Sequence, residues 1–200
     1  MNKFIAALVF AFTANFAAAN PMVAALKAED ESRLCPAAEV SKETRLLKRE
    51  AAYVLETMGL PKDSITVLVA TCGDYAVAAT SLNTIIISPS LAELPRGERL
   101  FLLAHEVGHL ANGDVKRLLA LGDELAASAE ALANVDKLMA TLSRENETAA
   151  DLFAAKFMQK VGVNAESAAS AFFARMGLLQ LPGTASHPAA QSRVAAIALA

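Results

Sequence analysis

The segment that most constrains the fold is LLAHEVGHLANGD, at Leu102–Asp114, which carries two of the chain's three histidines in an otherwise almost wholly apolar run. On a helix each residue turns by about 100°, so His105 and His109 lie about 40° apart on one face. Large apolar residues surround this face, and a helix that is apolar all round is normally central and buried. We therefore expect a buried helix over residues 96–112, ended by Gly113.

Two histidines and Glu106 buried in such a helix would cost several kcal/mol unless they were paired. A metal ion supplies that pairing, because His105 and His109 can offer neutral nitrogen ligands from adjacent turns. Glu106 points about 100° away from His105, so it can reach a water as general base without being a ligand. The motif HExxH alone is only suggestive, since it arises by chance in roughly one such chain in a hundred or two. A buried helix that happens to carry two histidines therefore stays open as an alternative.

A second helix, expected over residues 143–161, carries the candidate third ligand in the sequence SRENETAADLFAAKFMQKV. Helical spacing places Glu147 and Asp151 on its apolar face, whereas the lysines fall on the opposite face. Two core-facing carboxylates are costly without a partner, and a place in the zinc site supplies one for Glu147. Asp151, one turn later, can accept a hydrogen bond from a ligand histidine, most simply His105. A buried ion pair is the alternative for these two acids.

Small residues on this helix and other acids downstream of the motif also concern the same site. The small residues that would let the two helices approach closely are Ala150 and Ala154. The other acids that could supply a ligand downstream of the motif are Glu124, Glu130 and Glu145. Glu145 falls on the solvated face of the helix and Glu147 on its apolar face, so Glu147 is the preferred choice.

The third histidine, His187, stands in the loop TASHPAAQSR. A lone loop histidine is usually a surface residue, but here it could complete a site that uses every histidine of the chain. We expect it either to stabilise the oxyanion of a tetrahedral intermediate or to cap the zinc as a fourth ligand. Arg193, six residues later, could pair with a carboxylate of the site or bind substrate.

Around these two helices the pattern predicts an α+β domain, with a helix, a small three-stranded sheet and then helices only. Ser41 can cap the first helix, and Gly59 can end it. The strands are expected at 64–70, 75–80 and 83–88, and their short connections favour an antiparallel meander. The further helices are expected at 114–140, either unbroken or bent near Gly122, at about 165–178 and at 189–200.

The N-terminal residues MNKFIAALVFAFTANFAAANP have the form of a signal peptide. Lys3 is a basic start, Phe4–Phe16 is a mostly apolar run, and Ala19 ends a small-residue cleavage site. We therefore expect a signal peptide at 1–19, a single mature domain at 20–200 without a transmembrane segment, and a periplasmic or secreted location. The alternative is an uncleaved membrane anchor.

Cysteine content and charge narrow the functional classes further. Cys35 and Cys72 would remain after cleavage, and in an oxidising compartment they most simply form a disulfide. The formal net charge of −3 offers no basic surface for nucleic acid, so that class of partner is set aside.

Three linked motifs now resemble one family. HEVGH (105–109), ETAAD (147–151) and SHPAAQSR (186–193) match, in order, the pattern of metallopeptidase family 48, the HtpX-like and CAAX-prenyl-protease type of gluzincin. The resemblance covers roughly residues 64–200 and implies a mainly helical, minigluzincin-like domain. It implies that one Zn²⁺ is bound by His105, His109 and Glu147, with Glu106 as base and Asp151 behind the ligands.

The resemblance also implies that a strand near residues 75–80 holds a protein or peptide substrate in extended form. In this chain DYAVAA stands where the family usually has an Asn-Ala pair, and residues 114–140 are charged where many members carry transmembrane segments. The chain is therefore similar to a minimal, secreted form of the family.

Together these observations predict a zinc-dependent endopeptidase that hydrolyses peptide bonds of exported proteins through a metal-activated water, in protein quality control. A rival prediction is a periplasmic client-binding assembly or chaperone-like factor with a structural or regulatory zinc site. A further rival is an inactive scaffold, but a purely structural zinc site has no use for a base such as Glu106.

Overall fold

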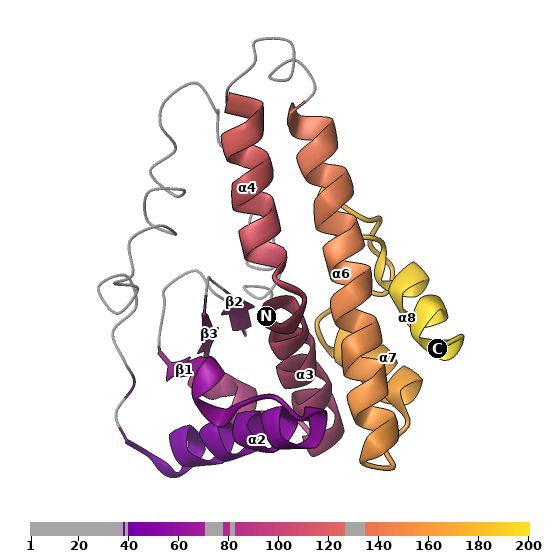
Figure 1. Cartoon of the computed structure of the whole chain (residues 1–200). Helices are drawn as coiled ribbons and strands as arrows, with labels where there is room; N and C mark the ends of the chain where they lie inside the picture. Colours follow the sequence, from indigo (N-terminus) through magenta and orange to yellow (C-terminus); the bar gives the residue numbers. More distant parts are fainter. Residues whose placement is uncertain (1–37, 39, 71–77, 81–82, 127–134) are drawn as a thin grey trace.

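The computed structural model of the chain describes residues 38, 40–70, 78–80, 83–126 and 135–200 (Figure 1). Helices dominate these residues, and a small sheet precedes most of them, so the α+β class is confirmed. The predicted signal peptide at 1–19 and the predicted disulfide between Cys35 and Cys72 lie outside the described residues.

The first described helix is α2 (Lys42–Met58), and its ends follow local rules. The Ser41 hydroxyl accepts a hydrogen bond from the backbone N–H of Thr44 at 3.1 Å, which satisfies one of the free donors at the start of the helix. Gly59 ends the helix with φ of 73°, a left-handed conformation that glycine adopts without strain. The predicted cap and stop are both confirmed.

The sheet has the strand order β1-β3-β2, which differs from the predicted meander. Strand β1 (Thr66–Val69) runs parallel to β3 (Thr84–Ile87), and β2 (Ala78–Thr80) pairs with the other edge of β3 in antiparallel orientation. The prediction of an antiparallel meander was wrong because it assumed that strands adjacent in sequence pair with each other. Instead, β3 lies between β1 and β2. The most apolar strand, β3, takes the centre, where Ile85 is fully buried.

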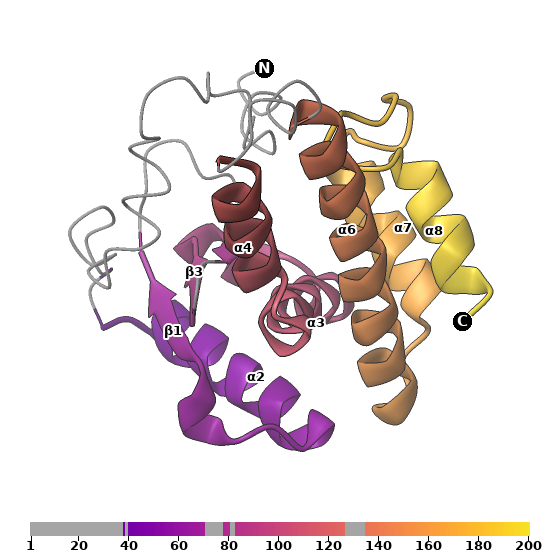
Figure 2. The same cartoon turned by 45° about the horizontal axis from the view of Figure 1, so that its top comes forward.

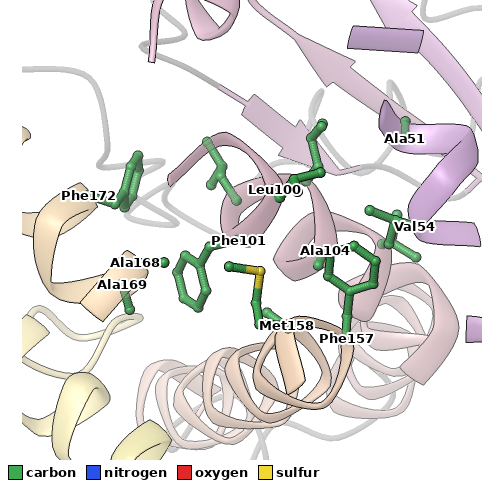
Figure 3. Packing of buried hydrophobic residues seen from close by; sticks show 14 of the residues in the cluster. Ala51, Val54, Leu100, Phe101, Ala104, Phe157, Met158, Ala168, Ala169 and Phe172 are labelled. Carbon is green, nitrogen blue, oxygen red and sulfur yellow. The ribbon is translucent and has the colours of Figure 1, made fainter. Parts of the chain in front are cut away.

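Helix α3 (Arg96–Asn112) is the central element, and it has the predicted bounds. It packs against α2, against strands β2 and β3, and against α4, α6 and α7. Figure 2 shows it almost end-on between α2, α4 and α6. Gly113 ends it with φ of 70°. Figure 3 shows the core around it, to which α2, α3, α6 and α7 contribute. The labelled residues include Val54, Leu100, Phe101, Phe157, Met158 and Phe172.

The two helices that follow the turn at Gly113 differ in extent from the prediction. Helix α4 (Asp114–Ala126) runs through Gly122, and the next described helix, α6 (Val135–Lys160), begins eight residues before position 143. No glycine or proline interrupts residues 135–142, so nothing in the local sequence stops the helix there. In Figure 1, α4 and the upper part of α6 lie side by side, and the lower part of α6 runs beside α3.

Two shorter helices complete the described fold. Asn164 caps α7 (Ala165–Arg175), and α8 (Ala190–Ala198) follows the loop that contains His187. Across the described ranges, no helix combines the length and the apolar composition needed to cross a membrane.

Helices α3 and α6 approach each other unusually closely at Gly108. A Cβ atom at this position would lie 3.0 Å from the Cβ of Phe153 and 3.1 Å from the Cα of Ala150. A larger residue on either helix would therefore push the helices apart. The predicted role of Ala150 as a small residue at the helix contact is confirmed, and Gly108 supplies the matching gap on α3.

Candidate metal centre

Three side chains converge where α3 crosses α6. The Nε2 atoms of His105 and His109 are 3.0 Å apart. The Glu147 carboxylate lies 3.6 Å from the first of these nitrogens and 3.4 Å from the second. Zinc bonds of about 2.0–2.1 Å in a tetrahedral arrangement place ligand atoms about 3.4 Å apart, so these spacings fit one zinc ion. The structure thus brings together the three predicted ligands as a group that could hold a metal.

The surroundings of these residues also fit a cation. His105 and Glu147 are buried, and a carboxylate and two imidazoles are the donor types that zinc takes in a catalytic site. Burial alone would lower the pKa of His109, but hydrogen bonds to Asp114 and Glu147 outweigh burial and raise that pKa to about 10. Burial would raise the pKa of Glu147, yet the hydrogen bond from His109 and nearby positive charges hold it far below its usual range. The cluster therefore favours positive charge at its centre.

A buried carboxylate and a buried arginine lie behind the ring of His105. The Asp151 Oδ1 atom lies 3.0 Å from Nδ1 of His105, although the two atoms do not meet the geometry of a hydrogen bond. Arg193 donates two hydrogen bonds to Asp151, from Nε at 2.7 Å and from Nη2 at 2.8 Å. Its Nη1 atom is also 3.0 Å from Glu147. Of the two predicted uses of Arg193, the structure therefore shows pairing with carboxylates of the site.

Aromatic rings close this side of the cluster against water. Phe101 stacks against the ring of His105, with centroids 6.5 Å apart. Phe173 meets Phe101 edge-on, and the Arg193 guanidinium lies 4.8 Å from the centre of the Phe173 ring. Because few water molecules can screen the charges here, the contact between Arg193 and the two carboxylates is stronger than a surface ion pair.

Behind His109 stands a second carboxylate, which the sequence reasoning missed. His109 Nδ1 and the Asp114 carboxylate are 2.8 Å apart, and Asp114 is buried. Arg117 donates to Asp114 and to the side-chain oxygen of Asn146, at 2.5 Å and 2.7 Å. A signal was present, because the Asn-Gly pair that ends the HExxH helix turns the chain and the next residue is an acid. Helical periodicity cannot detect a partner beyond such a turn.

Glu106 lies beside the cluster. Its side chain is buried, and its negative charge helps to raise the pKa values of both His109 and Arg193, so it is close to the three candidate ligands. Of the other acids considered as ligands, Glu145 is exposed, and the side chains of Glu124 and Glu130 lie outside those described.

His187 reaches the cluster from the loop before α8. Its Nε2 atom lies 3.4 Å from the Glu147 carboxylate, and burial lowers the pKa of the imidazole. The loop is tightly closed, because a Cβ atom on Gly183 would lie 2.7 Å from the backbone nitrogen of Ala189. Within it, the Ser186 hydroxyl is 2.8 Å from Nδ1 of His187. The predicted residue is thus held at the site by its own loop.

The comparisons with known proteins agree with this geometry. A search of curated proteins found no match. The model of Peptidase family M48 matches residues 41–199, a range that contains every candidate site residue discussed above. The chain therefore belongs to peptidase family M48, a family of zinc-dependent metallopeptidases.

Proposed function

We propose that this protein is a zinc endopeptidase that cleaves exported proteins, with a role in protein quality control. The observation that carries the proposal is the convergence of His105, His109 and Glu147 from two helices, with Glu106 beside them on α3. These three residues would hold one zinc ion per chain. A structural zinc site has no need for a separately placed acid beside its ligands, whereas a hydrolytic site needs a base.

In the proposed reaction, different residues of the chain transfer the proton and position the ligands. Zinc, when bound, acts as a Lewis acid that makes a water more acidic and a peptide carbonyl more electrophilic. Glu106 takes the proton from the attacking water and then delivers it to the nitrogen of the leaving amine, so the C–N bond breaks without releasing a free amide anion. Asp151 and Arg193 keep the ring of His105 and the carboxylate of Glu147 in place.

His187 serves in this proposal as a hydrogen-bond donor to the developing oxyanion. The Ser186 hydroxyl can donate to Nδ1, which leaves the proton of a neutral imidazole on Nε2. That nitrogen faces the cluster, 3.4 Å from Glu147. A protonated Nε2 can donate to an oxyanion but cannot bind a metal ion, so this arrangement favours oxyanion stabilisation over the role of a fourth ligand.

We further propose that substrate binds as an extended strand beside β2. This strand packs against α3 and pairs with β3 along one edge, and no strand in the described part of the chain pairs with its other edge. An extended peptide can add to such an edge through backbone hydrogen bonds, which accept many sequences. This mode suits an enzyme that acts on unfolded proteins.

We also propose a periplasmic or secreted location for this enzyme. The support for that location is the signal-peptide pattern in the sequence at 1–19.

A Glu106→Gln variant tests the proposal. The amide has nearly the same shape as the carboxylate but cannot take a proton, so zinc binding should persist while cleavage of an unfolded protein falls by at least about 100-fold. Metal analysis of the purified protein and a fluorescent casein-type assay measure the two properties. The matched control is Glu145→Gln, an exposed acid on α6, which should leave both unchanged.

The outcomes separate the proposal from its rivals. Undiminished cleavage by Glu106→Gln would remove Glu106 as the base. A wild-type protein that binds zinc and protects unfolded proteins without cutting them would instead support the client-binding factor.

A further inference from the structure

His109 is oriented by the first residue of the helix that follows it. The Nδ1 nitrogen of His109 is 2.8 Å from Oδ2 of Asp114, and the Asp114 side chain is 3 % exposed. In the neutral imidazole that a metal binds, a carboxylate that accepts the Nδ1 proton leaves the lone pair on Nε2. That nitrogen faces Nε2 of His105 and the Glu147 carboxylate. The hydrogen bond therefore selects the tautomer that a metal needs.

The Asp114 carboxylate is itself held from the far side. Arg117, one turn later on α4, donates from Nη2 to Asp114 Oδ1 at 2.5 Å and to Asn146 Oδ1 at 2.7 Å. Asn146 precedes Glu147 on α6. The contacts thus run from one candidate ligand on α3, through α4, to the residue beside another candidate ligand on α6.

The orientation of Asn146 supports this reading. Asn146 is buried, and its Nδ2 atom has no hydrogen-bond partner within the described part of the chain. An unpaired buried amide nitrogen is unfavourable. A contact elsewhere on the Asn146 side chain must therefore keep it in this orientation. That contact is the hydrogen bond that its oxygen accepts from Arg117.

We infer that Asp114 is a positioning residue for His109, that Arg117 and Asn146 hold it, and that α4 is therefore part of the metal centre rather than a spacer between the two ligand-bearing helices. The inference rests on the proposed zinc function. A carboxylate behind a ligand histidine fixes the direction of the ring and makes its nitrogen a better donor to the metal. Without it, His109 is free to turn or to take the other tautomer.

An Asp114→Asn variant tests the inference through zinc affinity, measured by competition with a chromogenic chelator on the purified protein. The expected result is affinity weaker by about 10- to 100-fold, with an unchanged far-ultraviolet circular dichroism spectrum. Glu98→Gln is a closely matched control. Glu98 is 5 % exposed and pairs with the half-exposed Arg175, as Asp114 is 3 % exposed and pairs with the half-exposed Arg117, but Glu98 contacts no histidine. Its zinc affinity should equal that of the wild type.

A second variant, Asp114→Ser, guards against a folding defect. Serine is small and polar, as aspartate is, but it lacks the carboxylate. The cobalt-substituted protein adds a spectroscopic measure, because loss of an oriented imidazole changes the visible absorption bands of Co²⁺. Both Asp114 variants should show the weaker zinc affinity and altered cobalt bands, and Glu98→Gln should show neither.

The outcomes also distinguish this inference from the proposed function. If the wild type binds no zinc, the proposed function fails. If the wild type binds zinc and folded Asp114→Asn binds it equally well, only the inference is overturned. Loss of the fold in both Asp114 variants would likewise overturn it, because the carboxylate would then serve folding rather than the metal.

Discussion

The two histidines of α3 are supported in the same way but in different surroundings. Behind each ring stands a carboxylate, and behind each carboxylate stands an arginine. Around His105 these are Asp151 and Arg193, and the arginine side chain is 8 % exposed. Around His109 they are Asp114 and Arg117, and the arginine side chain is 48 % exposed.

We call each pair of a carboxylate and an arginine the support of its histidine. The difference in burial between the two arginines predicts that the two supports differ in function. A buried arginine that faces two carboxylates neutralises charges that have no water to stabilise them, so the fold depends on it. A half-exposed arginine contributes little to stability, because water and salt can replace it. The support of His105 should therefore matter to folding and to the metal, whereas that of His109 should matter mainly to the metal.

The largest effect should come from Arg193→Met. The variant leaves Asp151 and Glu147 as buried acids without their main counter-charge, so the metal-free protein should lose about 3–5 kcal/mol in free energy of unfolding. Urea denaturation in the presence of a chelator measures this loss, and added zinc should restore part of it. Arg144→Met, on the exposed face of α6, is the control and should change stability by less than about 0.5 kcal/mol. Equal losses in the two variants would contradict a structural role for Arg193.

An intermediate effect is expected from Gly108→Ala, which acts on both supports at once. The added methyl group would press on Phe153 and on the backbone of Ala150, so the helices must separate, at a cost of about 1–3 kcal/mol. Thermal unfolding and zinc titration measure the two consequences, and both should be impaired.

Gly97→Ala is the control for this change, because it lies on the same helix and its added Cβ would meet nothing closer than 3.9 Å. It should leave stability unchanged or raise it slightly, since alanine favours the helix more than glycine does. If Gly108→Ala behaved in the same way, the close approach of the helices would not limit the site.

The smallest effect on stability should come from Arg117→Met. Its side chain is half exposed, so the free energy of unfolding should fall by no more than about 1 kcal/mol. Urea denaturation under the conditions used for Arg193→Met allows a direct comparison. A loss as large as that of Arg193→Met would remove the distinction between the two supports.

Much of the site could be predicted from the sequence where the signal was local. The bounds of α3, the buried positions of Glu147 and Asp151 on α6 and the cap of α2 all follow from residues within about one turn of each other. The start of α6 was predicted too late, because a helix without a strong stop signal continues for as long as packing favours it.

Other features depend on which distant segments meet. The strand order was predicted wrongly because short connections do not by themselves decide which strand becomes central. Asp114 was missed because the turn at Gly113 interrupts the helical spacing, so that spacing could not show that the acid contacts His109. The two contacts of Arg193, to Asp151 and to Glu147, require α8 to dock on α6.

The sequence by itself determined the chemistry available to this protein, since the HExxH helix and the two core-facing acids are defined by helical spacing over a few residues. Only the tertiary structure decided how that chemistry is held. It places a carboxylate and an arginine behind each histidine, and it buries one arginine while leaving the other half exposed. The reason is physical: periodicity depends on neighbours along the chain, whereas burial and charge pairing depend on which helices pack together.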